Sequence, residues 1–512
     1  MSNPNPPAAT APALRRLLWI GAIALAAYGF FLARNSSNVA GGADSSGYLN
    51  SARLLAAGSL AAELRTPPEF GPQASLRRQQ FQPHGFVPFD GNPRLSPTYA
   101  VGLPLHLALA GKLFGWTLAA PIVGVSAALA ALLLIHAVGR QLGLDPVLAV
   151  TGAVILAAYP VFLFTSIQPL SDTLATTWCL AAIAAALRAR THAGWAWVAG
   201  TALAIAVLVR ATNVLLLPAL LVILGLDFRR LLFAALGGLP WALWLGYYNH
   251  TLYGGALRSG YVDITQAFGW AYGPPTLVHF VQWLALLLPA ALLVLPVVAV
   301  RRSEGNGRVL LALGLWFGAF TGLYLFYEIS REVWWDLRFI LPGTPALILA
   351  ALLGVDAWAR RREARASTRL RPFRTLAAIG LGVWAIGLSW YWTGRFHLLL
   401  TKVYEQGYAD AAAAARAEFP AGALVLAGLH SGSLYYYTEF PVMRWEFVNA
   451  EEFARFRQLA AAAGRPIAAL LYDVEEREAL QEKCPGPWTK VASVKNVSLW
   501  QLGPPPASVP KK

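Results

Sequence analysis

Long apolar runs separated by short polar stretches dominate the first four hundred residues of the chain. Each run is close to the ~20 residues that a helix needs to cross the hydrocarbon core of a bilayer. The pattern predicts twelve helices, at about 14–33, 97–114, 118–138, 147–165, 170–188, 194–209, 212–226, 229–247, 276–300, 308–327, 338–357 and 373–392. It therefore predicts a polytopic α-helical membrane protein.

Clusters of arginine between the apolar runs indicate which helix ends face the cytoplasm. The clusters are Arg15/Arg16, Arg140, Arg188/Arg190, Arg229/Arg230, Arg301/Arg302/Arg308 and the seven arginines from Arg360 to Arg374. If all twelve segments crossed, the clusters on either side of 97–138 would lie on opposite faces of the membrane. We expect segment 97–114 to dip into the membrane or lie on it, because it is short and contains Gly102 and Pro104. The topology then has about 11 transmembrane helices, with the N-terminus in the cytoplasm.

The extracytoplasmic segments in this topology are about 34–117, 166–171, 248–275, 328–337 and everything after 393. The first extracytoplasmic loop, 34–117, is far longer than the usual connection, which marks it as functional or disordered. Within that loop, residues 48–64 have helical periodicity. We expect an amphipathic helix there, lying at the membrane interface.

After Trp392 the pattern changes to short β-rich runs that alternate with polar helices, which is typical of a soluble α/β domain. The elements are predicted at 423–429, 431–437, 442–447, 450–463, 467–472, 475–482 and 491–502. We divide the chain into a transmembrane catalytic bundle at 1–394, an extracytoplasmic α/β domain at 395–502 and a disordered tail at 503–512.

Composition supports a membrane location, because 57% of the 512 residues are hydrophobic and only 13% are charged. Soluble domains carry roughly 25% charged residues. The net charge of +15 comes from the arginine clusters, whose placement reports topology, so we expect no nucleic-acid partner. We expect the protein in the bacterial inner membrane, and the arginine placement puts the α/β domain on the periplasmic side.

Asp44 lies just beyond the outer end of the first helix, in the segment ADSSGY at 43–48. Tyr48 follows it by four residues, on the same face of a helix that begins here. Asp44 is placed where water, lipid headgroups and substrate meet, so it is a candidate catalytic residue and Tyr48 a candidate substrate-binding residue. The structural alternative is that Asp44 caps the helix.

Asp172 lies in the segment PLSD at 169–172, at the outer end of a predicted helix that it could also cap. A carboxylate at membrane depth is costly and therefore a candidate functional residue. Asp44 and Asp172 would share the outer face. Together they could bind a divalent metal, or divide the roles of base and orienting group. The sequence therefore does not decide whether the protein uses a divalent metal as a cofactor.

Two arginines at the outer face are candidate phosphate-binding residues. Arg210 interrupts a long apolar stretch, and Arg338 opens a predicted helix in the segment RFILP at 338–342. A guanidinium can bind a phosphate through two parallel hydrogen bonds. The alternatives are that Arg210 extends its charge toward water and that Arg338 pairs with Asp336 or Glu328.

Arg258 and Tyr261 lie in the glycine-rich segment YGGALRSGY at 253–261, which could shape a sugar pocket or simply connect two helices. The sequence has no His/Cys/Asp spacing typical of a zinc site. It also has no Walker loop and no dinucleotide fingerprint. A soluble nucleotide substrate therefore has no evident binding loop, and an isoprenoid-linked donor fits better.

With these motifs in order along nearly the whole chain, the sequence resembles the GT-C superfamily of polyprenyl-phosphate-dependent glycosyltransferases. The resemblance is to family 39-like enzymes, relatives of the protein O-mannosyltransferases and the lipid A aminoarabinose transferases. It rests on ADSSGY at 43–48, SPTYAVGLP at 96–104, PLSD at 169–172, LVRAT at 208–212, YGGALRSGY at 253–261 and RFILP at 338–342.

The resemblance implies that Asp44 is the catalytic base and that Asp172 supports it or binds metal. It also implies a helical bundle with an extracytoplasmic C-terminal domain. Many relatives carry Asp-Glu in the first loop, whereas Ser45 follows Asp44 here. The basic residue often found before the second helix is also absent, so Arg210 and Arg338 become the candidates for binding the donor phosphate.

The expected function is an inverting transfer of a hexosyl or pentosyl group from a polyprenyl-phosphate-linked sugar donor to an acceptor hydroxyl. The acceptor is a glycan, a lipid or a protein. The alternative is a transporter or flippase of lipid-linked sugars. Such a protein usually has inverted repeats and discontinuous helices at the bilayer midplane, and the sequence indicates neither.

Overall fold

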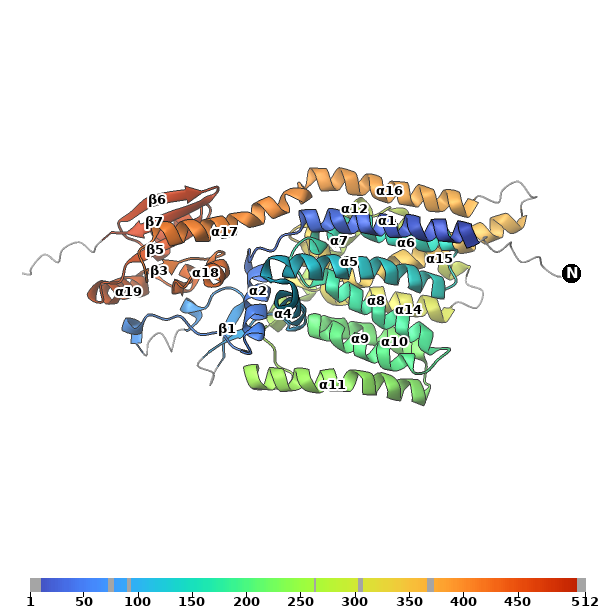
Figure 1. Cartoon of the computed structure of the whole chain (residues 1–512), viewed down its shortest axis with the longest axis horizontal. Helices are drawn as coiled ribbons and strands as arrows, with labels where there is room; N and C mark the ends of the chain where they lie inside the picture. Colours follow the sequence, from blue (N-terminus) through green and yellow to red (C-terminus); the bar gives the residue numbers. More distant parts are fainter. Residues whose placement is uncertain are drawn as a thin grey trace, which may run out of the picture.

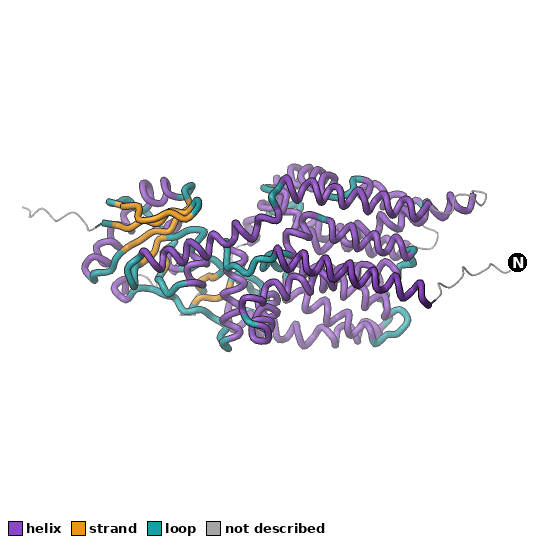
Figure 2. The backbone as a smooth tube through the Cα atoms, turned by 45° about the horizontal axis from the view of Figure 1, so that its top comes forward, coloured by secondary structure: helices purple, strands orange, loops and turns teal. Residues whose placement is uncertain are grey.

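The computed structural model describes residues 11–71, 78–89, 94–261, 264–302, 307–365 and 373–503. A helical bundle and a small α/β domain lie at opposite ends of its long axis, with a layer of loops and short helices between them (Figure 1). Strands are confined to the α/β domain and this intermediate layer (Figure 2). The prediction of a disordered tail concerns residues that, apart from Gly503, lie outside the described ranges.

Most helices of the bundle run roughly along the long axis of the molecule (Figure 1). They are α1 (Ala11–Asn35), α5 (Trp116–Gln141), α6 (Pro146–Ala158), α7 (Pro160–Ser166), α8 (Asp172–Ala189), α9 (Trp195–Val209), α10 (Leu217–Leu224), α11 (Phe228–Tyr253), α12 (Gly273–Leu287), α13 (Ala291–Arg301), α14 (Gly307–Tyr324), α15 (Thr344–Arg365) and α16 (Phe373–Arg395). The 3-10 helices η3 (Ala211–Leu216) and η7 (Trp334–Gly343) precede α10 and α15.

Several of these helices can span a membrane. Among the described residues, five are long and apolar enough, or up to seven if each of two bent pairs is one span. Shorter apolar helices occur at Gly102–Phe114, Trp195–Val209 and Ala211–Leu224. The predicted multi-pass helical bundle is thus confirmed. The figure of about 11 crossings stays a prediction.

Two predicted straight helices are broken in the structure. Segment 147–165 divides into α6 and α7 with a bend of 64°, and segment 276–300 divides into α12 and α13 with a bend of 99°. Both breaks occur at a proline: Tyr159 before Pro160, and Leu288 before Pro289, have extended backbones. Proline disfavours helical geometry in the residue before it and removes a helix hydrogen bond, so apolar length alone misses these bends.

The intermediate layer contains α2 (Ala43–Ala56), β1 (Phe86–Pro88), β2 (Leu95–Pro97) and α4 (Gly102–Phe114). We expected an amphipathic interfacial helix over 48–64, and this is wrong in its bounds and in its exposure, whereas a position at the membrane interface stays a prediction. Helix α2 ends at Ala56, and all of its residues from Ser45 to Ala52 are buried. The reason is that α4 packs on one side of α2 and the α/β domain packs on another. Segment 97–114 forms only the 13-residue helix α4, about 20 Å long, which is shorter than the hydrocarbon core.

The α/β domain is built on a five-stranded sheet of order β4-β3-β5-β7-β6. The strands are β3 (Leu424–Leu426), β4 (Val442–Met443), β5 (Ile467–Tyr472), β6 (Trp488–Val494) and β7 (Val497–Leu502). Strand β3 pairs in parallel with β4 and β5, whereas β7 pairs antiparallel with β5 and β6. The predicted single run 491–502 is therefore most of a β6–β7 hairpin.

Helices cover both faces of this sheet. Alternate residues of β3 and β5 point to opposite sides: Leu424 and Leu426 join one apolar cluster, and Val425 joins another. The first cluster includes Phe453 of α19 (Ala450–Ala462), and the second includes Ala411 of α17 (Thr401–Glu418). The predicted α/β domain is confirmed, and α17 connects it to the last helix of the bundle (Figure 1).

Candidate active site

The candidate residues gather at the end of the bundle that faces the α/β domain, which we call the aspartate end. Helix α2 carries Asp44 in its first turn, and α8 begins with Asp172. Arg210 follows the end of α9, and Arg338 lies in η7. Segments far apart in the sequence thus bring four charged side chains together.

Asp44 forms an ion pair with Arg338, with 2.8 Å between Oδ2 and Nη2. The alternative that Asp44 caps α2 is wrong, because Gly42 is the N-cap residue and no side chain caps this helix. Asp336 binds the backbone N–H groups of Glu332 and Val333, at 2.9 and 2.8 Å, instead of pairing with Arg338.

Asp172 forms the second ion pair, with Arg210. Ser171 is the N-cap residue of α8 and no side chain caps it, so Asp172 does not cap this helix either. Helix α9 stops at Val209, and the extended backbone of Arg210 directs its side chain toward Asp172. The start of α4 packs here against the backbone of Leu208 and Val209, because Gly102 has no side chain to obstruct the approach.

The two ion pairs form one electrostatic cluster. Arg338 interacts electrostatically with Asp172 as well as with Asp44, and Arg210 interacts with Asp44. The ring of Phe339 lies under both guanidiniums, 5.6 Å from Arg210 and 5.3 Å from Arg338. Because each charge has a partner, four ionised groups can share this partly buried region.

Tyr48 and Tyr99 connect this cluster to the first loop. The Tyr48 hydroxyl donates to Ser171 Oγ at 3.0 Å, which joins α2 to the start of α8. Tyr99 forms a side-chain hydrogen bond with Asp44, and its ring lies 5.0 Å from that of Tyr48. Tyr99 can approach α2 so closely because Gly47 has no side chain: a Cβ there would lie 2.6 Å from Tyr99 Cδ2.

The environment of Asp44 keeps it ionised. Burial alone would raise the pKa of Asp44, but the charge and hydrogen bond of Arg338, the hydroxyl of Tyr99 and the charge of Arg210 together bring it below its ordinary value. Burial and the neighbouring Asp44 raise the pKa of Tyr48 and of Tyr99. At neutral pH the carboxylate therefore accepts protons and the two phenols donate hydrogen bonds.

The two aspartates differ in their access to solvent. The side chain of Asp44 is 31% exposed, whereas that of Asp172 is 2% exposed. Asp44 is therefore the more accessible of the two carboxylates to a substrate hydroxyl. Asp172 is placed to hold Arg210.

Of the other two candidates, one lies beside the cluster and one does not. Tyr261 is 42% exposed, its ring is 6.1 Å from that of Tyr99, and it interacts electrostatically with Asp44 and Arg210. Arg258 is exposed and lies over Gly255 of its own loop. Within the described residues, no interaction links Arg258 to the cluster, so its role in substrate binding stays a prediction.

The two aspartates do not fit a divalent metal. Each carboxylate already has a guanidinium partner, and a metal ion there would face both arginines. In the part of the chain that the structure describes, no group of three or more His, Cys, Asp or Glu side chains is arranged to hold a metal.

Sequence reasoning missed several residues of this site. Tyr99 lies in a segment that carried the family resemblance, and Ser171 and Phe339 are direct neighbours of Asp172 and Arg338. A single tyrosine in a long loop, such as Tyr99, does not by itself indicate a functional residue. Only the packing of the first loop on α2 places Tyr99 against Asp44.

The α/β domain lies directly against the start of α2. Ser433 Oγ donates to the carbonyl of Ala40, and Asn50 Nδ2 donates to the carbonyl of Gly432 at 3.0 Å. Glu405 of α17 lies against Gly41, and its Oε2 is buried without a hydrogen-bond partner among the described residues. Burial raises the pKa of Glu405 to about 7. The conformation around Asp44 thus depends on both parts of the molecule.

Fold and site together define a multi-pass membrane protein whose helical bundle carries a cluster of paired aspartates and arginines beneath a small α/β domain. No protein-family model and no curated protein matches the chain. Solved structures do. ArnT from Cupriavidus metallidurans, bound to undecaprenyl phosphate, superposes with a TM-score of 0.61 at 14% identity, over 94% of this chain and 98% of that one.

Two further solved structures are similar. The oligosaccharyltransferase of Archaeoglobus fulgidus has a TM-score of 0.53 at 13% identity, over 88% of this chain and 69% of that one. The arabinofuranosyltransferase AftD from Mycobacteria has a TM-score of 0.50 at 14% identity, over 89% of this chain and 41% of that one. The chain therefore has the fold of these membrane glycosyltransferases, which confirms the fold that the sequence resemblance implied.

Proposed function

We propose that this protein is an inverting glycosyltransferase that moves a sugar from a polyprenyl-phosphate donor to an acceptor hydroxyl at the periplasmic face of the bacterial inner membrane. The observation that carries the proposal is the accessible Asp44 carboxylate, kept ionised by Arg338 in a cluster with Arg210. The fold agrees, since ArnT was solved with undecaprenyl phosphate and the archaeal enzyme with dolichol phosphate.

Asp44 acts as the general base in the proposed reaction. It accepts the proton of the acceptor hydroxyl while that oxygen attacks the anomeric carbon of the donor sugar. The bond between that carbon and the lipid phosphate oxygen breaks on the opposite side, so the configuration inverts. The products are the glycosylated acceptor and polyprenyl phosphate.

Arg338 and Arg210 stabilise the phosphate as it leaves. A guanidinium has five N–H donors, so it can bind a carboxylate and still donate to a phosphate oxygen. The side chains of Arg338 and Arg210 are 20% and 16% exposed, so their charges lie in a partly dehydrated environment. There they stabilise the developing negative charge more strongly than they would in bulk water.

The proposal is tested with purified protein and a panel of radiolabelled polyprenyl-phosphate sugars, hexosyl and pentosyl, in proteoliposomes. A labelled glycan, lipid or protein product identifies a transferase. Movement of the donor between leaflets without any product would identify a flippase instead. The Asp44→Asn variant serves as the matched inactive sample.

The role of the arginines is tested separately by Arg338→Lys and Arg210→Lys. Lysine keeps the charge but loses the two-point geometry, so we expect weaker donor binding and a higher KM for the lipid-linked sugar. Arg331→Lys is the control, because Arg331 lies at the same end of the bundle, over the ring of Tyr272. Unchanged donor affinity in both variants, at normal protein levels, would remove these arginines from the site.

A further inference from the structure

The connection between α1 and α2 leads from the bundle to Asp44. Residues 36–42 of this connection are not helical, and Val39, Ala40 and Gly41 are buried. Buried backbone groups outside regular structure need hydrogen-bond partners from elsewhere in the molecule. The source of these partners therefore decides what holds the segment that precedes Asp44.

The bundle holds the first half of the connection. Ser37 donates its backbone N–H to the carbonyl of Ile167 at 2.8 Å. The side chain of Asn38 accepts from the backbone N–H of Ala120 at 3.2 Å and donates to the carbonyl of Trp116. Residues 37 and 38 are thus anchored to the bundle.

The α/β domain holds the second half of the connection. Helix α18 (Ser431–Tyr437) supplies two side chains that bind the backbone of Ala40. The Tyr437 hydroxyl accepts from the N–H of Ala40 at 3.0 Å, and Ser433 Oγ donates to the carbonyl of the same residue. Both backbone polar groups of Ala40 are therefore bound by the α/β domain.

Helix α17 adds a third side chain, Tyr408. Its hydroxyl forms a hydrogen bond with the backbone of Gly42, and a Cβ on Gly41 would lie only 2.9 Å from Tyr408 Cδ2. The rings of His430 and Tyr472 pack against the ring of Tyr408, with centroids 4.6 and 6.0 Å away. Tyr408 is therefore itself held in place by aromatic packing.

Gly42 connects these contacts to Asp44. It is the N-cap residue of α2, and Asp44 is the second residue of that helix. Gly42 has a φ of +51°, a backbone conformation that favours glycine. Because Gly42 sets where α2 begins, its position also sets the position of the carboxylate that pairs with Arg338.

We propose that Tyr408 and Tyr437 are positioning residues for the transfer reaction: they fix the backbone at 40–42 from the α/β domain and so hold Asp44 beside Arg338. The inference rests on the proposed function, which makes Asp44 the base. A catalytic group must be held within about 0.5 Å of its productive geometry, and a displacement of about 1 Å can cost roughly 10²-fold in rate. The α/β domain thereby takes part in catalysis through the geometry of α2.

The test is the variant Tyr408→Phe/Tyr437→Phe of the full chain, which removes both hydroxyls and keeps both rings. Tyr435→Phe is the matched control, because the hydroxyl of Tyr435, also on α18, donates to the backbone carbonyl of Glu63 at 3.1 Å. That bond reaches the same first loop at a position beyond the far end of α2. Initial rates per folded molecule, over a range of lipid-linked sugar concentrations, give kcat and KM, and thermal unfolding checks that each variant is folded.

We expect kcat of the double variant to fall about 10- to 100-fold through displacement of the base. The KM for the donor should stay within a few-fold of the parent, because Arg210 and Arg338 are unchanged. A merely structural role would lower the unfolding temperature without this separation of kcat from KM. The control should keep both constants.

Gly42→Ala tests the same inference with both tyrosines in place. An alanine strains the backbone at a φ of +51°, so kcat should fall again with little change in KM. Gly58→Ala is its control, just beyond the other end of α2. There φ is +77° and an added Cβ would meet no atom within 4 Å, so the variant carries similar strain away from the base.

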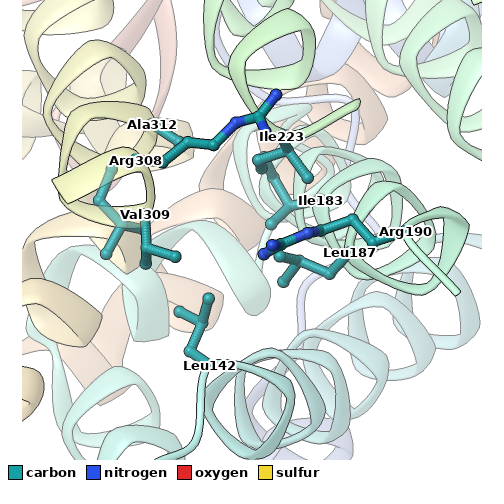
Figure 3. Close-up of a pocket in the computed structure, with 9 residues that line it drawn as sticks. Leu142, Ile183, Leu187, Arg190, Ile223, Arg308, Val309 and Ala312 are labelled. Carbon is teal, nitrogen blue, oxygen red and sulfur yellow. The ribbon is translucent and has the colours of Figure 1, made fainter. Parts of the chain in front are cut away.

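Hydrogen exchange of the backbone amides at 40–42 measures how firmly the segment is held, without any substrate. Loss of the tyrosine hydrogen bonds should make this exchange about 10-fold faster in the double variant and leave it unchanged in the control. Residues 183–190, at the opposite end of the bundle, serve as the reference. Their neighbours Leu142, Ile223 and Arg308 all belong to the bundle (Figure 3).

Unchanged exchange at 40–42 in the double variant would overturn the proposal. Faster exchange with an unchanged kcat would overturn it too, because Asp44 would then not depend on the segment. An equal loss of kcat in Tyr435→Phe would assign the effect to general loosening of the α/β domain, against the proposal. A parent that transfers no sugar would contradict the proposed function, whereas the exchange measurement would still decide whether the α/β domain holds the segment.

Discussion

Arginines occur at both ends of the bundle, but they differ in how buried and how paired they are. At the aspartate end, Arg338 and Arg210 are mostly buried, and each is paired with an aspartate. At the opposite end of the bundle, which we call the arginine-rich end, Arg190 and Arg308 are exposed. A buried charge needs a partner, whereas an exposed one is stabilised by water and lipid headgroups. A buried arginine that is paired with a carboxylate is thus a candidate active-site residue, whereas an exposed arginine at a helix end indicates the orientation of the helix in the membrane.

The largest expected effect distinguishes the carboxylates of the two ends. Asp44→Asn keeps the shape of the side chain but cannot accept a proton, so turnover should fall about 10² to 10⁴-fold. Asp227→Asn is the control, because Asp227 caps α11 at the arginine-rich end and asparagine caps equally well. Turnover is measured per folded molecule with a defined lipid-linked sugar. Activity of Asp44→Asn within a few-fold of the parent would return Asp172 as the leading base.

The second effect concerns stability at the two ends. Asp172→Asn leaves the mostly buried Arg210 without its carboxylate, which should cost roughly 3 to 5 kcal/mol of unfolding free energy. Asp356 is also buried, but its closer partner Arg360 is 55% exposed and can be rehydrated. Its second partner, Arg374, keeps an ion pair with Glu363, so Asp356→Asn should cost only about 1 kcal/mol. Thermal and denaturant unfolding of both variants in the same detergent measures the difference. Equal losses of unfolding free energy in Asp172→Asn and Asp356→Asn would show that the burial of the partner arginine does not set the cost.

The third effect is a change in pH dependence at the aspartate end. Asp44 has a lowered pKa, so the base stays ionised until the pH falls below the usual aspartate range, and kcat/KM should hold until then. Arg338→Gln removes the main opposing charge and leaves burial, which raises the pKa of Asp44. The acid limb of the profile should therefore move to higher pH, whereas Arg338→Lys should keep it near the parent. An acid limb that stays in place in Arg338→Gln would separate Arg338 from the ionisation of Asp44.

The smallest effect tests how the α/β domain holds the aspartate end. The pKa of Glu405 is about 7 in the folded protein and about 4.5 in the unfolded chain, so the folded state binds more protons between these values. Stability should therefore fall as pH rises from about 4.5 to about 7, and level off above that. Glu405→Gln should remove this slope, whereas Asp410→Asn on the same helix should keep it. Thermal unfolding across this range provides the measurement, and an unchanged slope in Glu405→Gln would assign it to another group.

The apolar pattern alone predicts most of the bundle, because the thickness of a bilayer imposes a length on every crossing helix. The predicted segments 118–138 and 229–247 fall within α5 and α11. The length of an apolar run does not predict the bends at Pro160 and Pro289. Proline can occur in a membrane helix with or without a break, depending on whether neighbouring groups satisfy the freed backbone. The apolar pattern does not predict the burial of α2 either, because the α/β domain that covers it comes from the far end of the chain.

By itself, the sequence determined which residues are candidates at the aspartate end. A charge at membrane depth is costly enough to stand out, as with Asp172 and Arg210. Asp44 and Arg338 stand out as charged residues at the outer ends of predicted helices. Only the tertiary structure decided how they pair, that Tyr99 joins them and that Arg258 lies apart. The physical reason is that the cost of a buried charge can be inferred at one position, whereas its partner depends on how separate helices pack together.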